Sequence, residues 1–223
     1  KGYAERDPSA DVLGFDACRK ICILSDIAFG RNIPPELVPA EGITAVTLED
    51  VAYAASAGKR IKLLGRAVRQ PDGRVCALVA PHLVDESDPL SGVEDVFNAI
   101  TVRGDSIGEV MFYGRGAGKL PTASAVCADV LDIAAHQGRR KAMSWGPGGA
   151  EVLCPADGLR SRWYVRALER EETLQSALGK ARALHAPAAA EECACLTGEE
   201  LTRAELDGRL AGLEVLSAFR VLD

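Results

Sequence analysis

The spacing of apolar and polar positions predicts alternating helices and strands along the 223 residues. Apolar residues recur every three to four positions after Gly14, which predicts a helix over 15–29. Thr47 precedes two acids and an apolar run, so a capped helix is expected over 47–57. The same helical period over 121–136 predicts a third helix in the first half of the chain.

Short apolar runs rich in β-branched residues predict two hairpins in the same half. One hairpin turns at Gln70-Pro71-Asp72-Gly73 and the other at Gly104-Asp105, both of which are typical turn sequences. The strands are expected at 60–69, 74–80, 96–103 and 106–113. Together with the helices they predict an α+β fold, with a mixed or antiparallel sheet covered by helices on one face.

A cluster of glycines and prolines over 138–160 predicts a linker, after which the pattern changes. The tail reads as strand, helix, strand, helix, strand, at 162–168, 173–184, 192–196, 202–213 and 216–222. Thr202 and Glu205 have the spacing of a capping box at the start of the second tail helix. A small α+β domain is therefore expected over 161–223.

Composition excludes several classes of protein. The net charge of −6 disfavours a nucleic-acid or anionic-membrane surface, and no apolar run has the roughly 18 residues of a membrane span. The odd number of cysteines and their apolar neighbours favour reduced, mostly buried thiols in a cytoplasmic protein. They stand at positions 18, 22, 76, 127, 154, 193 and 195.

The first twenty residues contain the densest set of candidate chemical groups. Asp16 and Lys20 are four apart, so they lie one above the other on the expected helix. One interpretation is a solvated ion pair, worth about 0.3 to 0.5 kcal/mol. The other is that they converge with Glu5 and Asp11 on a polar ligand, where a lysine among carboxylates can act as a general acid.

A second candidate is the glycine-rich run Gly114-Arg115-Gly116-Ala117-Gly118, which leads into a helix near Leu120. Backbone N–H groups at a helix N-terminus can bind an anion. A tight turn from strand to helix would need the same glycines for backbone geometry alone. The spacing leaves both interpretations open.

Several distinctive sequence blocks follow one another across residues 1 to about 136. The first block, from Gly2 to Lys20, reads Gly-Tyr-x-Glu-x-Asp-Pro-x-x-Asp-x-x-Gly-x-Asp-x-x-Arg-Lys. The later blocks are Ala40-Glu41-Gly42-Ile43-Thr44, residues 60–65, Val96-Phe97-Asn98-Ala99, residues 108–118 and residues 120–125. In this order they resemble the catalytic domain of homoserine dehydrogenase, and the shared order makes the resemblance specific.

The resemblance implies an enzyme that interconverts L-homoserine and L-aspartate 4-semialdehyde in threonine and methionine biosynthesis. Lys20 matches the proposed proton donor to the aldehyde oxygen, and Asp16 would orient Lys20 or the substrate. Glu5 matches the glutamate that binds homoserine, and Asp11 and Asp16 match acids of the substrate pocket. Gly2 and Gly118 match glycines that contact the cofactor, NADP or NAD.

Most of the cofactor site is expected in a nucleotide-binding domain that precedes this point in the family. The chain has no early GxGxxG, so we expect it to be the C-terminal part of a longer enzyme and inactive alone. The expected domains are a catalytic and dimerisation domain over 1–137, the linker, and the tail domain over 161–223. A homodimer or higher homo-oligomer is expected, and no metal ligands are assigned. The histidines are expected at the surface or at helix ends, at positions 82, 136 and 185.

The tail resembles a reduced ACT domain, the amino-acid-binding module found in many bacterial homoserine dehydrogenases. ACT domains have an Asp-x-Pro-Gly turn after the first strand, but this chain has Glu-Arg-Glu-Glu-Thr at 169–173. We therefore expect the tail to serve assembly more than feedback by threonine. The alternative functions are a dimerising, amino-acid-sensing regulatory module without chemistry and a reductase of another amino-acid semialdehyde.

Overall fold

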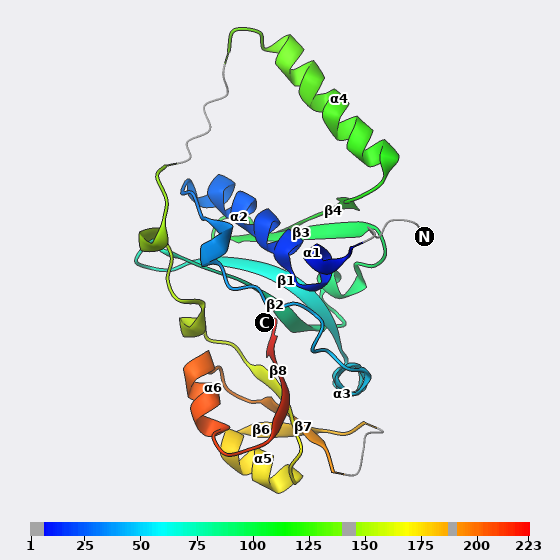
Figure 1. Ribbon diagram of the computed structural model, residues 1–223, viewed down its shortest axis with the longest axis vertical. Helices are drawn as coiled ribbons and strands as arrows, with labels where there is room; N and C mark the ends of the chain where they lie inside the picture. Colours follow the sequence, from blue (N-terminus) through cyan, green and yellow to red (C-terminus); the bar gives the residue numbers. More distant parts are fainter. Residues whose placement is uncertain (1–6, 140–145, 187–190) are drawn as a thin grey trace. The chain divides into compact units, whose positions relative to one another are not determined.

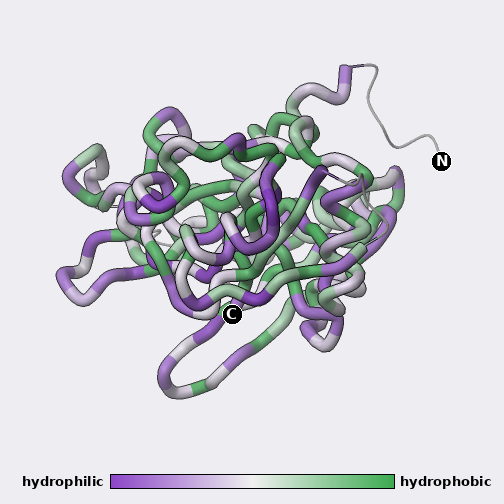
Figure 2. The backbone as a smooth tube through the Cα atoms, turned by 90° about the horizontal axis from the view of Figure 1, so that it is seen from below, coloured by the Kyte–Doolittle hydropathy of each residue, from purple (hydrophilic) through white to green (hydrophobic). Residues whose placement is uncertain are grey.

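The computed structural model describes residues 7–139, 146–186 and 191–223. The chain divides into two compact units, one comprising residues 9–86 with 144–223 and the other comprising residues 1–8 with 87–143. Figure 1 labels their helices and strands, and each unit is described by itself. Figure 2 colours the backbone by hydropathy and shows hydrophobic stretches alternating with hydrophilic ones along the chain.

The larger unit contains a six-stranded sheet in the order β1-β2-β8-β5-β7-β6. Its strands are β1 (Lys59–Arg69), β2 (Val75–Asp85), β5 (Trp163–Ala167), β6 (Ala181–Leu184), β7 (Cys193–Thr197) and β8 (Val215–Val221). All neighbouring strands are antiparallel except β2 and β8, which pair in parallel at His82↔Arg220 and Leu83↔Val221. The tail strands therefore extend the first hairpin into one sheet.

This grouping differs from the four-stranded sheet expected in the first half of the chain. The four strands are present, but β3 (Phe97–Gly104) and β4 (Gly108–Arg115) form a separate two-stranded sheet. Hairpins are specified by local turn sequences, whereas the pairing of one hairpin with another strand depends on distant side chains. The sequence pattern therefore predicted each hairpin but did not predict which other strands it pairs with.

Glycines and side-chain caps set the ends of the helices on one face of the large sheet. The short α1 (Ser9–Val12) leads to Gly14, whose φ of 81° lets the chain turn into α2 (Phe15–Phe29). The helix α3 (Leu48–Ser56) starts with a capping box, in which Thr47 and Asp50 satisfy each other's backbone N–H groups. Both predicted helices are confirmed.

Apolar side chains fill both faces of the sheet. On one face, Cys18 and Cys22 of α2 pack against Val75 and Val79, and further along Tyr53 of α3 belongs to a second buried cluster. On the other face lie the tail helices α5 (Glu171–Leu178) and α6 (Arg203–Arg209) (Figure 1), whose leucines cluster with Trp163 and Val165. Because side chains alternate along a strand, β5 contributes Trp163 and Val165 to this cluster and Tyr164 to the one on the opposite face.

The tail has one strand more than the sequence pattern predicted. A helix over 173–184 was wrong in its second half, because Gly179 ends α5 with a φ of 78° and β6 follows at Ala181–Leu184. The order is therefore β-α-β-β-α-β, with neighbouring strands antiparallel, which is the ferredoxin-like arrangement. The predicted capping box of Thr202 and Glu205 is confirmed at the start of α6.

The smaller unit contains the β3–β4 hairpin and the helix α4 (Lys119–Ala135). Phe97 and Tyr113 stack on one face of the hairpin, with ring centroids 4.9 Å apart. The guanidinium group of Arg115 lies 5.2 Å from the centre of the Phe97 ring. Within the described ranges, no helix combines the length and the apolar character needed to cross a membrane.

The buried position of His82 on a strand corrects the expectation that each histidine lies at the surface or at a helix end. His82 is 0% exposed in β2, and its Nδ1 lies 2.8 Å from the carbonyl oxygen of Ala80 while its Nε2 has no hydrogen-bond partner. Burial lowers the pKa of His82 to about 3, so the ring is neutral in the folded protein. His136 ends α4 and His185 is exposed, as expected.

We expect His82 to make the protein less stable in mild acid. The unfolded chain binds a proton near pH 6.5 and the folded chain does not, so stability falls as pH drops from about 6.5 toward 3. The free energy of unfolding lost through this one histidine is at most about 1.4 kcal/mol per pH unit, or roughly 2 kcal/mol between pH 6.5 and 5. Urea unfolding at several pH values measures it. His82→Gln should flatten the slope and His185→Gln should not; equal slopes in both variants would contradict the assignment.

Candidate functional site

The predicted contact between Asp16 and Lys20 is present at the start of α2. Lys20 Nζ lies 2.6 Å from a carboxylate oxygen of Asp16, and the two side chains are 57% and 42% exposed, respectively. A pair with this exposure contributes little to stability, because water screens it and two long side chains must be ordered. The pair is thus accessible to a ligand, and breaking it costs little stability. Both properties suit a role in chemistry better than a role in folding.

The turn between α1 and α2 fixes the direction of this helix. Asp11 lies on α1, and its carbonyl oxygen accepts a hydrogen bond from Gly14 N–H at 3.1 Å. A side chain at Gly14 would meet Val79 Cγ1 at 3.2 Å and the carbonyl oxygen of Glu41 at 3.4 Å. The turn therefore packs closely against β2 and the loop before α3. Asp11 lies just before this packed turn and Asp16 just after it.

The remaining predicted site residues lie elsewhere. Glu5 and Gly2 fall outside the described residues. Gly118 belongs to the smaller unit, where it directly precedes α4 with φ 120° and ψ 152°, a conformation that favours glycine. A side chain at Gly116 would overlap the Asn98 side chain. Close packing therefore accounts for Gly116, and backbone conformation accounts for Gly118.

Sequence analysis missed a buried polar network around Asp50. Asp50 is fully buried, and its carboxylate accepts hydrogen bonds from the side chains of Arg166, Tyr164 and Ser217 at 2.8, 3.0 and 2.6 Å. Arg166 also donates to Glu192 at 2.7 Å and to Thr47 Oγ1 at 3.0 Å. Asp50 was assigned only to the first turn of a helix, and no local signal identified partners more than a hundred positions away.

The hydrogen bonds of this network decide the charge of Asp50. Burial alone would raise the pKa of its carboxyl group, but donors from Arg166, Ser217 and Thr47 outweigh burial and lower the pKa. Burial opposes the charge of Arg166 in the same way, and its bonds to Asp50 and Glu192 raise its pKa above the ordinary value. Both groups are therefore ionised in the folded protein.

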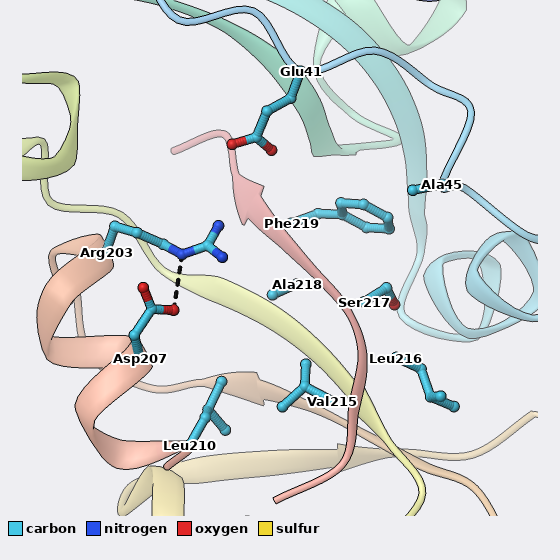
Figure 3. A pocket seen from close by; sticks show the side chains of 10 residues that line it. All are labelled: Glu41, Ala45, Arg203, Asp207, Leu210, Val215, Leu216, Ser217, Ala218 and Phe219. Atoms are coloured by element: carbon cyan, nitrogen blue, oxygen red, sulfur yellow. Dashed lines mark hydrogen bonds and ion pairs between the residues drawn. The ribbon is translucent and has the colours of Figure 1, made fainter.

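A pocket of about 460 Å³ includes Ser217, a member of this network, in its lining (Figure 3). Its lining comes from the loop before α3, from α6 and from β8. Arg203 and Asp207 face it as an ion pair with Nε and Oδ1 2.9 Å apart. The lining residues are Glu41, Ala45, Arg203, Asp207, Leu210 and residues 215–219. None of them belongs to the site predicted from the sequence.

Five of the seven cysteines are buried and contribute to packing, whereas Cys154 is partly buried and Cys127 is exposed. All seven are free, and Cys193 and Cys195 are buried in β7 beside the apolar tail core. Burial raises the pKa of Cys195 to about 12, with Cys193 and Glu171 adding to the effect. A thiol in this environment is a poor nucleophile and a poor metal ligand. Among the described residues, no group of three or more histidine, cysteine or acidic side chains could hold a metal ion.

Comparisons with known proteins point to one family. A family profile described as homoserine dehydrogenase matches residues 1–131, which include Asp11, Asp16, Lys20 and Gly118. The homoserine dehydrogenase of Neisseria gonorrhoeae is 41% identical over 179 residues, covering 77% of this chain and 41% of the relative. That of Synechocystis is 50% identical over 135 residues, covering 59% of this chain and 31% of the relative.

Solved structures extend the similarity across the tail. A homoserine dehydrogenase from Thiobacillus denitrificans superposes with a TM-score of 0.79 at 30% identity, covering 99% of this chain and 56% of the other. The S. aureus homoserine dehydrogenase at pH 7.0 gives a TM-score of 0.77 at 34% identity, with coverage of 99% and 56%.

The chain spans about two fifths or less of the length of these two curated relatives. The relatives are named as enzymes, which does not favour a purely regulatory module. The profile match, the identities and the conserved fold agree, and the chain belongs to the homoserine dehydrogenase family.

Proposed function

We propose that the whole protein interconverts L-homoserine and L-aspartate 4-semialdehyde with NAD or NADP. The observation that carries this proposal is the exposed Asp16–Lys20 pair at the start of α2, within the region that matches the family. Reduction of an aldehyde to an alcohol requires a hydride at carbon and a proton at oxygen. Lys20 is a group in this chain that can supply that proton.

Each acidic residue has a proposed role in binding the substrate. Asp16 holds the Lys20 ammonium group in position, because its carboxylate lies 2.6 Å from Nζ. Lys20 then donates a proton to the aldehyde oxygen and stabilises the negative charge that develops there. Asp11 contributes to the substrate pocket, and Glu5 binds the substrate ammonium group. We thus propose Lys20 and Asp16 as the catalytic pair and Glu5, Asp11 and Asp16 as the substrate-binding acids.

We infer that Gly118 and Gly2 contact the cofactor. The nicotinamide group, when bound, supplies the hydride to the carbonyl carbon or accepts it from the alcohol. Gly118 fits such a contact because it precedes the first turn of α4, where backbone N–H groups have no partner within the helix. A bulky residue at that backbone conformation would be strained, so glycine keeps the approach open.

An assay of the full-length enzyme tests the function. We expect oxidation of homoserine with NAD or NADP, followed by the absorbance of the reduced cofactor, and no turnover by this 223-residue chain alone. Asp16→Asn should lower turnover without a large change in melting temperature, since the exposed pair is worth less than about 1 kcal/mol. A folded, cofactor-binding full-length enzyme that does not oxidise homoserine would exclude this substrate.

We propose that the β3–β4 hairpin forms an interface with a second copy of the chain. Ile100 pairs with Phe112 and Val102 with Val110, so the four apolar side chains share one face, on which all are exposed. Exposed apolar faces of this kind are typical of interfaces. In sedimentation experiments on the full-length enzyme, Phe112→Lys should weaken dimerisation by about tenfold or more, and Leu48→Lys on α3 should not. Unchanged dimerisation of the Phe112 variant would contradict this interface.

We propose that the tail is an ACT-like module that serves assembly, in line with a division into domains 1–137 and 161–223 joined by a linker. The helix α5 begins with Glu171 and Glu172 and has no side-chain cap, so its first turn repels the carboxylate of an amino acid. Calorimetry of the full-length enzyme should therefore show no tight binding of threonine. Tight binding that excess homoserine does not displace would contradict this role.

We further propose a cytoplasmic location, which suits seven free thiols.

A further inference from the structure

The tail sheet makes a buried polar contact with the rest of the larger unit at the N-terminus of α3. Asp50 is the third residue of that helix and completes the capping box with Thr47. Arg166 donates to both residues, through Nε to Asp50 at 2.8 Å and through Nη2 to Thr47 at 3.0 Å. The guanidinium group of the tail therefore holds the point at which the preceding loop enters α3.

That loop, residues 40–46, extends from the polar network to the candidate site. Glu41 N–H donates to the carbonyl oxygen of Val79 on β2, and Ile43 N–H donates to the carbonyl oxygen of Val12, both at 2.8 Å. Val12 follows Asp11 directly. One end of the loop is thus bonded to the turn that carries the substrate acids, and the other end is bonded to the tail through Thr47.

Close packing makes this loop a rigid connection. A side chain at Gly42 would overlap the carbonyl oxygen of Val12 and would approach Leu13 Cα to 2.6 Å. Gly14, which precedes α2, also lies against this loop, since a side chain there would meet the Glu41 carbonyl oxygen at 3.4 Å. Because the contact at Gly42 has no room to adjust, a shift at the start of α3 is transmitted to the turn before Asp16.

We propose that Arg166 is a positioning residue, which sets the geometry of Asp11 and Asp16 through Asp50, Thr47 and the loop 40–46. This inference rests on the proposed function for its kinetic consequence and on the hydrogen bonds above for the connection itself. It gives the tail a role in substrate binding that requires no effector. The pocket of Figure 3 borders the same connection, since Glu41 and Ala45 line it from the loop and Ser217 from β8.

Hydrogen exchange on the full-length enzyme tests the connection without relying on activity. In Arg166→Met, the amides of residues 9–16 and the Ile43 amide should exchange faster than in the wild type, and Arg166→Lys should restore part of the protection. Arg162→Met is the matched control, because Arg162 pairs with Asp223 at the surface near the same strand. Faster exchange confined to residues 47–56 and 163–221 would overturn the proposal.

Kinetics test the consequence for the substrate. Arg166→Met should raise KM for homoserine by about 2- to 30-fold, the span of couplings through packed networks, and change kcat and KM for the cofactor little. If Arg166→Met does not fold, Ser217→Ala removes a single 2.6 Å hydrogen bond to Asp50 and should produce a smaller effect of the same kind. An unchanged KM in a folded variant would overturn the inference.

The two proposals fail in distinguishable ways. A wild-type enzyme that does not turn over homoserine contradicts the proposed function, while faster exchange at residues 9–16 in Arg166→Met still supports the connection. A wild type that is active, with a variant whose exchange and KM are both unchanged, contradicts the role of Arg166 alone.

Discussion

Lys20→Ala in the full-length enzyme is expected to reduce turnover of homoserine by about 10²- to 10⁴-fold, the usual contribution of a general acid. The variant should remain folded, since Lys20 is 57% exposed and its contact with Asp16 is a screened surface pair. Initial rates measured from cofactor absorbance, together with a melting curve, separate loss of chemistry from loss of folding.

Two further variants show whether Lys20 acts as a proton donor or only as a positive charge. Lys20→Arg keeps the charge and can keep a contact with Asp16, but a guanidinium group does not give up a proton at neutral pH. The turnover of Lys20→Arg should therefore be nearly as low as that of Lys20→Ala. Lys180→Ala, at an exposed lysine of the tail, is the matched control and should retain wild-type turnover. A loss smaller than about tenfold in Lys20→Ala would remove Lys20 from the role of proton donor.

Asp50→Asn should lower the free energy of unfolding by about 3 to 5 kcal/mol, the cost of breaking one partner of a buried ion pair. The substitution leaves Arg166, whose side chain is 5% exposed, without its main counter-ion, and it places an amide NH2 donor where a carboxylate oxygen accepted hydrogen bonds. For a protein of this size the melting temperature should fall by roughly 6 to 20 °C. Urea unfolding and a melting curve measure the effect.

The pH dependence of this variant provides a second readout. Because the pKa of Asp50 is lowered in the folded state, its contribution is present above the unfolded pKa and is lost as pH falls below about 4. The wild type should lose this stability in acid, and Asp50→Asn should not. Asp207→Asn, which breaks the exposed pair with Arg203, is the control and should cost less than about 1 kcal/mol. An equal cost in both variants would show that burial does not set the strength of the Asp50 network.

The sequence determined those features whose causes lie within a few residues of one another. The capping boxes of Thr47 and Thr202 and the left-handed conformation of Gly14 follow from local hydrogen bonding and from the absence of a side chain. The contact of Asp16 with Lys20 follows from the pitch of a helix. The spacing of Asp16 and Lys20 left their roles open, and the resemblance to a family supplied the proposed roles.

Only the tertiary structure decided which distant groups meet. Ala181–Leu184 has strong helix formers such as alanine and leucine, yet it is a strand because β7 offers it an edge. His82 lies on a strand whose pairing with β8 removes it from water. Asp50 and Arg166, 116 positions apart, were both typical surface residues by sequence, and the folded sheet made them a buried pair. Local sequence specifies backbone conformation, whereas burial and charge pairing depend on packing between segments far apart in the chain.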